Sequence, residues 1–219
     1  MDRYLNVLQL LNNLDSNQTT NKITKSHTSS ELEFWHTDDD RETITVMLQS
    51  AGVTSNDRLI AINLGTTWRT KQWDPRNFAA VIQKISDIAP NFRVVLTGST
   101  EEQTLLKDIT IPESTINLVA KTDIMQLGAL LERCEVCLTC DSGPMHIAAA
   151  VKTPTIALFG PTAPKRHQPY GSGHTIIEKP VYCRPCYKRK CHRKDLPHQC
   201  MKDITTHEVI NTLSAHLNL

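Results

Sequence analysis

Four short polar segments of this 219-residue chain each follow an apolar run, and their residue types favour binding of an anion. Such segments, where a buried strand gives way to a loop, collect at one edge of a parallel sheet, which is the edge that binds ligands. The segments are 65–71 (GTTWRTK), 97–102 (TGSTEE), 141–146 (DSGPMH) and 160–162 (GPT).

The third segment is the most specific of the four. Ser142, Gly143 and Pro144 lead into a helix whose first N–H groups have no partner inside the helix, and these groups together with the helix dipole attract anions. Gly143 permits close approach of a ligand to the backbone. Pro144 lacks a backbone N–H, and in the first turn of a helix that N–H would have no partner inside the helix. We therefore expect this bend to hold a phosphate or diphosphate.

The other segments supply complementary groups. Lys71 can neutralise a phosphate, hydroxyls can donate to its oxygens, and Glu102 can accept from the hydroxyl pair of a ribose. The hydroxyl donors are Thr66, Thr67 and Thr162. Each bend taken alone is more often an ordinary turn, since turns need Gly, Ser and Asp. His146 is equally suited to packing at the start of the helix, and a lone Lys71 is most often a solvated surface residue. Only the four bends together favour a nucleotide or sugar-phosphate site.

An alternation of strands and helices positions these bends. Apolar runs at 59–65, 92–98, 115–120, 135–140 and 153–160 predict buried strands, and the stretches between them predict helices. The predicted helices cover 74–90, 100–109, 123–134 and 144–151, and a last helix runs from Thr205, with Glu208 completing a capping box. In the first of these, Asp74 is the expected N-cap and the buried face is Phe78, Ile82, Ile85 and Ile88. The expected fold is α/β, with a Rossmann-like parallel sheet and helices on both faces.

The first 57 residues follow a different pattern. Leu5, Leu8 and Leu11 predict a short amphipathic helix, and the polar run 16–30 predicts a loop or tether. A further helix is expected over 37–52, with Thr37 as N-cap and Gly52 just beyond its end.

Composition excludes several functional classes. A net charge of +1 provides no overall field to recruit nucleic acid, so no nucleic-acid partner is expected. The chain has no run near the ~20 apolar residues of a membrane span, and we expect no signal peptide. Seven cysteines, an odd number, favour a reducing cytoplasm. Cys134, Cys137 and Cys140 are expected to be small core residues.

The segment 183–200 is rich in cysteine and in basic residues. Cys183, Cys186, Cys191 and Cys200 could hold a structural zinc, but the last two do not repeat a C-x2-C pair. Free thiols or occasional disulfides are therefore favoured over zinc. The basic residues of this segment indicate a solvated loop slightly more than contact with anionic lipid at the inner membrane. They are Arg184, Lys188, Arg189, Lys190, Arg193 and Lys194.

Three motifs in order give the chain a resemblance over residues 58–215. The stretches INLGTTWRTKQWDPRNFAAVI, CDSGPMHIAAAVKTPTIALFGPTAP and CRPCYKRKCHR…CMKDITTHEVI resemble the glycosyltransferase family 9 heptosyltransferases. That family has two Rossmann-like domains facing across a cleft, the GT-B arrangement, and transfers heptose from ADP-heptose to the lipopolysaccharide inner core. The resemblance implies that residues 58–219 are the donor-binding domain and that 1–57 are the tail of an acceptor domain plus a linker.

The resemblance also implies roles for individual residues. Thr66, Thr67 and Lys71 match positions that contact the donor diphosphate, and Glu102 (or the neighbouring Glu101) matches the ribose-binding acid. Asp141, Ser142, Gly143 and His146 match the loop at the diphosphate and sugar, and Gly160 to Thr162 match its companion loop. The general base of the family has no counterpart here, so the catalytic residue is unknown and competence of this chain alone is in doubt.

Three readings of function follow from these observations. The leading one is an inverting heptosyltransferase, cytoplasmic or peripheral to the inner membrane, that needs no cofactor at its donor site. A sugar-nucleotide epimerase of the same architecture is the second, and a non-catalytic nucleotide-sugar binding module is the third.

Overall fold

The computed structural model describes residues 32–219, and the expected N-terminal helix and tether lie outside this range. Its centre is one six-stranded sheet in which every pairing is parallel, as expected. The strand order is β3-β2-β1-β4-β5-β6. The strands are β1 (Arg58–Asn63), β2 (Phe92–Thr97), β3 (Ile116–Asn117), β4 (Val136–Cys140), β5 (Thr155–Phe159) and β6 (Thr175–Glu178).

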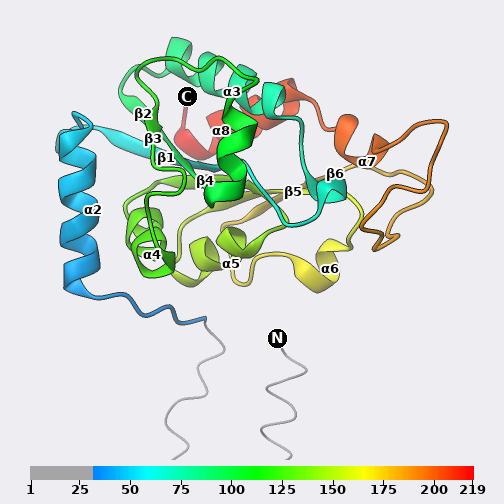
Figure 1. Ribbon diagram of the computed structural model, residues 1–219, viewed down its shortest axis with the longest axis horizontal. Coiled ribbons are helices and arrows are strands. Elements are labelled where there is room, and N and C mark those ends of the chain that lie inside the picture. Colours follow the sequence, from blue (N-terminus) through cyan, green and yellow to red (C-terminus); the bar gives the residue numbers. More distant parts are fainter. Residues whose placement is uncertain (1–31) are drawn as a thin grey trace, which may run out of the picture. The chain divides into compact units, whose positions relative to one another are not determined.

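Helices cover both faces of the sheet, which confirms the expected fold (Figure 1). Side chains alternate along β1: Ile60 and Ile62 pack with α3 (Pro75–Ile88) and α8 (Thr206–Leu217) on one face. On the other face Leu59 and Ala61 pack with α2 (Asp38–Ser50), α4 (Ile124–Glu132) and α5 (Gly143–Ala150). Because both faces are buried, the strands are apolar throughout rather than alternating.

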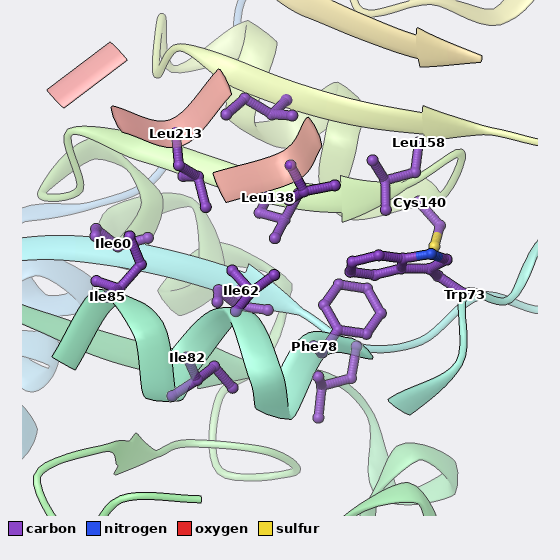
Figure 2. Packing of buried hydrophobic residues seen from close by; sticks show 14 of the residues in the cluster. Ile60, Ile62, Trp73, Phe78, Ile82, Ile85, Leu138, Cys140, Leu158 and Leu213 are labelled. Carbon is purple, nitrogen blue, oxygen red and sulfur yellow. The ribbon is translucent and has the colours of Figure 1, made fainter. Parts of the chain in front are cut away.

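The hydrophobic core between the sheet and helices α3 and α8 contains the largest buried side chains. Trp73 and Phe78 meet edge to face, with ring centroids 4.9 Å apart, beside Cys140 and below Leu158 (Figure 2). The indole of Trp73 also donates to the carbonyl of Ile204, so that the segment before α3 is held to the segment before α8. Cys134, Cys137 and Cys140 are all buried, as predicted, and burial raises the pKa of each thiol.

Several predicted helix ends are confirmed. Thr37 caps α2 through Asp40, and Gly52 follows that helix with φ +77°, a conformation that suits glycine. Asp74 caps α3 by accepting from the backbone of Arg76. At α8, Thr205 accepts from the backbone of Glu208, but the Glu208 carboxylate pairs with Lys179 instead of closing the capping box.

Other predictions were wrong in detail. The segment 100–109 forms a 3-10 helix, η3 (Thr100–Leu106), because its Ser99–Glu102 capping box tightens a stretch with no buried residue. The strand expected over 115–120 is reduced to the two residues of β3. Ile88 lies at the end of α3 with 39% of its surface exposed, and Val81 takes the place expected for it in the core. The short elements β6, α6 (Pro164–His167) and α7 (Gln199–Lys202) were not anticipated.

No helix in residues 32–219 combines the length and the apolar character needed to cross a membrane.

Gly128 in α4 gives a test of this packing. A Cβ at this position would lie 2.2 Å from the ring of Phe34, so the segment before α2 rests directly on the glycine. Alanine in a helix interior is normally about 1 kcal/mol better than glycine. We expect Gly128→Ala to bring no such gain, because the ring must move, whereas the same change in a Phe34→Ala background should bring it. Denaturant unfolding of the four chains measures the difference, and equal gains in both backgrounds would contradict the contact.

Candidate functional site

A cleft of about 360 Å³ opens at the carboxyl ends of β1, β2 and β4. Strand order reverses between β1 and β4, and in open α/β sheets this switch point is where ligands bind. The cleft therefore lies where the fold, independently of any motif, is expected to bind a ligand. Its lining residues are Asn63, Gly65, Thr66, Thr67, Gly98, Ser99, Glu101, Glu102, Thr122, Asp123, Ile124, Leu127, Ser142, Gly143, Pro144 and Ile147.

Five of the predicted residues line this cleft. Thr66 and Thr67 come from the bend after β1, Glu102 from η3, and Ser142 and Gly143 from the start of α5. The bends of the first three predicted segments thus meet at one place, although they lie far apart in the sequence.

The start of α5 presents its backbone to the cleft. Ser142 is the N-cap residue, but its side chain makes no capping bond and instead contacts the Thr139 hydroxyl at 3.0 Å. A Cβ added at Gly143 would meet no atom within 4 Å, so this residue borders open space. The first N–H groups of α5 therefore remain available to a ligand, and the positive end of the helix favours an anion there.

Glu102 is held in a fixed position at the opposite wall. It closes the capping box of η3 by accepting from the backbone N–H of Ser99. A Cβ at Gly65 would lie only 1.9 Å from Glu102, so the glycine provides the space that this carboxylate occupies. Glu101 also lines the cleft but is exposed, whereas Glu102 is half-buried. The arrangement favours Glu102 over its neighbour as the acid that accepts from a ligand.

Lys71, Asp141 and Thr162 form a buried cluster directly beside the cleft. The Lys71 ammonium lies 2.8 Å from the Asp141 carboxylate, and these side chains are 13% and 5% exposed. The Thr162 hydroxyl donates to the same carboxylate at 2.6 Å, and the Thr66 hydroxyl donates to the Asp141 carbonyl at 3.3 Å. Lys71, predicted as a phosphate partner, is thus paired to an acid, which fixes its position next to the cleft.

His146 lies on α5, one turn after Ser142. Partial burial lowers the pKa of its imidazole below the ordinary value, Asp141 opposes this shift, and His167 and Lys71 add to it. Burial therefore favours the neutral form of the ring. A diphosphate nearby would favour its protonated form.

Gly160 is not among the residues that line the cleft. A Cβ there would meet the Met201 sulfur at 2.5 Å, and its carbonyl accepts from Arg184. The absence of a side chain at Gly160 allows the cysteine-rich segment to pack against it. Thr162 is connected to the site only through its hydrogen bond to Asp141.

An apolar wall of the cleft was missed in the sequence. Ile124, Leu127 and Ile147 line it, and Ile124 is 59% exposed. Asp123, the N-cap of α4, follows β3 and lies at the same edge of the sheet. A helix over 123–134 was predicted from the sequence, but none of its residues was assigned to the site.

The cysteine-rich segment packs beside the cluster of Lys71, Asp141 and Thr162. Arg184 donates to the carbonyls of Lys179 and Thr162, at 2.8 and 3.1 Å, and pairs with Glu178. Arg193 is buried against Asp195 and lies over the ring of Tyr182. Two of the six basic residues are thus internal, and the exposed ones are Lys188, Arg189, Lys190 and Lys194.

The four cysteines of this segment are unpaired thiols. Burial raises the pKa of the Cys200 thiol, Arg184 opposes this shift, and the other three cysteines add to it. Within residues 32–219, no three side chains of the metal-binding types are arranged to hold an ion.

Comparisons with known proteins identify the family of this chain. The family model of glycosyltransferase family 9 (heptosyltransferase) matches residues 1–196. A lipooligosaccharide heptosyltransferase 2 of Campylobacter jejuni is 32% identical over 161 residues, which are 70% of this chain and 49% of that protein. The chain spans about half the length of the curated relatives it matches.

Two solved structures share the fold. The family 9 glycosyltransferase of Veillonella parvula superposes with a TM-score of 0.76 at 23% identity, covering 99% of this chain and 59% of its own. The ADP-heptose LPS heptosyltransferase II of Escherichia coli does so with a TM-score of 0.66 at 23% identity, covering 85% and 53%. With its cleft at the switch point and a family model that matches most of its length, the chain belongs to glycosyltransferase family 9.

Proposed function

We propose that residues 58–219 bind the donor of a heptosyltransferase, and that this donor is ADP-heptose. The observation that carries the proposal is a cleft bordered by the free helix start of α5 and by Glu102, with Lys71 held beside it by Asp141. The names of the relatives support the donor: one of the superposed structures is an ADP-heptose LPS heptosyltransferase. The acceptor proposed by the same argument is the inner core of lipopolysaccharide.

The donor would be held by three kinds of contact. The N–H groups of α5 and the Lys71 ammonium would bind the diphosphate, Glu102 would accept from the ribose hydroxyls, and the apolar wall at Ile124 would cover the base. As the acceptor hydroxyl attacks the anomeric carbon, the bond to the diphosphate breaks and ADP leaves with the electron pair. Groups already placed at the diphosphate stabilise that growing charge without rearrangement. The proton of the acceptor hydroxyl passes to a base that we place outside residues 58–219.

The donor site as proposed requires no divalent metal. A magnesium ion would need carboxylate ligands free to bind it. Asp141, the acid at the diphosphate position, is already engaged by Lys71 and Thr162. The positive charges of Lys71 and of the helix start would take the role that a metal ion serves in other glycosyltransferases.

We also propose that the chain works at the cytoplasmic side of the inner membrane, where the acceptor is assembled. The exposed Lys188, Arg189, Lys190 and Lys194 support a peripheral contact with anionic lipid.

Lys71→Ala tests the diphosphate contact. Loss of the ammonium should weaken ADP binding by about 1.5–3 kcal/mol, the range for a hydrogen bond to a charged group. Calorimetric titration of ADP into the variant measures the change. Lys84→Ala, an exposed lysine of α3, is the matched control and should bind as the wild type does. Equal affinity in the Lys71 variant and the wild type would remove this residue from the site.

The cysteine-rich segment is expected to hold free thiols. Purified protein should then contain well under one zinc or iron per chain, and Cys183→Ser should leave the melting temperature almost unchanged. Elemental analysis and thermal unfolding with and without a chelator measure both. One metal ion per chain, with a fall in melting temperature on chelation, would show instead that the four thiolates bind metal.

The 219-residue chain alone should bind ADP-heptose and transfer it slowly or not at all. Transfer needs both reactants aligned, and effective molarities of ~10⁵ M or more depend on that alignment. Only about half of the relatives' length is matched by this chain. Labelled ADP-heptose with a core acceptor measures transfer, and full-length E. coli heptosyltransferase II serves as positive control.

Each alternative has a distinct outcome in the same assay. Efficient transfer would place the base within the chain, with Asp141 and His146 the first residues to test. Isomerisation of the donor without acceptor would favour an epimerase, and absence of ADP binding would refute the proposal.

A further inference from the structure

A second pocket, of about 330 Å³, shares no lining residue with the donor cleft. It is formed by η2 (Arg69–Lys71), by the start of α3 and by α7. Three of its residues are basic: Arg69, His198 and Lys202. Nothing in the proposed donor contacts uses them.

The positive charge of this pocket is not neutralised by the protein. Arg69 and Lys202 are exposed and form no ion pair with any residue in 32–219. Asp74 is the single acid in the lining, and its carboxylate is engaged by the side chain of Arg76 at 2.6 Å. Two permanent cations therefore border one concavity without a free acid.

His198 lines the same pocket as these two cations. Partial burial lowers the pKa of its imidazole, and Lys202 and Arg69 both lower it further. The ring is thus acted on by both cations at once. Two nearby positive charges repel each other. An anion bound between them would offset that repulsion and so stabilise the pocket.

We propose that the pocket bordered by Arg69, His198 and Lys202 binds a phosphate group carried by a ligand other than the donor nucleotide. A guanidinium matches phosphate oxygens with two parallel N–H donors, and an ammonium adds a point charge. Asn77 contributes an amide to the same lining. The volume also leaves room for the sugar or glycerol unit that carries a phosphate monoester.

The cysteine-rich segment builds half of this site. His198 and Lys202 lie at its end, and the segment is tied to η2 because the Thr70 hydroxyl donates to the Lys188 carbonyl at 2.7 Å. The same short helix thus carries Lys71 at one end, beside the donor cleft, and Arg69 at the other. The second pocket needs no assumption about the donor, so it stands or falls separately from the proposed function.

Titration of the full 219-residue chain with inorganic phosphate, followed by amide chemical shifts, tests the site. Saturable shifts are expected at Asn77, His198 and Lys202. The double variant Arg69→Ala/Lys202→Ala should bind phosphate about tenfold more weakly or worse, because it loses two charge-assisted contacts. Both residues are exposed, so the variant should fold, and its melting temperature checks this.

The matched control is Lys84→Ala/Arg133→Ala, which removes one lysine and one arginine from exposed positions elsewhere. It should bind phosphate as the wild type does. Equal weakening in both double variants would show only a general effect of net charge and would overturn the proposal. Shifts confined to Thr66, Thr67 and the start of α5 would place phosphate in the donor cleft and would overturn it as well.

A second arm identifies where the phosphate comes from. Vesicles of phosphatidylcholine with and without phosphatidic acid are sedimented with wild type and with Arg69→Ala/Lys202→Ala. Binding that needs both phosphatidic acid and the two basic residues would identify a lipid headgroup. Site-specific binding of free phosphate without vesicle binding would identify a soluble phosphate-bearing ligand. Each result supports the pocket, and binding of neither probe would refute it.

Discussion

The buried carboxylate of Asp141 is the constraint on which the arrangement of the loops depends. A charge taken out of water is tolerated only when it is paired and hydrogen-bonded, and here Lys71 and Thr162 satisfy it. These partners come from the loops after β1 and β5, while Asp141 itself follows β4. One ionic requirement therefore fixes three loops relative to one another. Removing a partner from such a buried pair commonly costs about 3–5 kcal/mol, so the loops form together or not at all.

The sheet beneath the loops determines where they meet. Its strands are buried on both sides, and each side packs against its own group of helices. The chain fills one side of β1 with β2 and β3 before it crosses to β4 on the other side. The loops after β1 and β4 consequently diverge, which leaves the cleft that the start of α5 borders. The hydrophobic pattern that folds the protein is thus also what opens the site.

Sequence patterns predicted the parts of this structure that depend on local rules. Long apolar runs identified five of the six strands, although β3 is shorter than predicted. Asp74 and Thr37 identified helix starts because a capping side chain acts within three residues. β6 escaped notice because its four residues are short and only Ile177 is buried. Ile88 was placed in the core by helix spacing, yet the helix ends there and the side chain reaches solvent.

In the site, too, the residues placed by local rules could be predicted, and those placed by tertiary packing could not. Residues in the bends were identified because parallel strands bring their carboxyl ends together, whichever helices lie between. The pairing of Lys71 with Asp141 could not be predicted, since it joins residues 70 positions apart through tertiary packing alone. Gly160 was assigned to the ligand because its bend resembles the others, whereas the structure uses its missing side chain to admit Met201. Glycine in a turn does not by itself reveal which neighbour approaches it.

The contacts of Arg184 have a consequence for how this family member could diversify. Its guanidinium binds the carbonyls of Gly160, Lys179 and Thr162 at once, and only a planar group with several fixed donors can do this. Arg184 thereby holds the start of the cysteine-rich segment to the end of β5, independently of the later residues of that segment. Substitutions at the exposed positions Lys190 and Lys194 would leave this anchoring unchanged. Side chains there can therefore change without moving the loops that border the cleft at the start of α5.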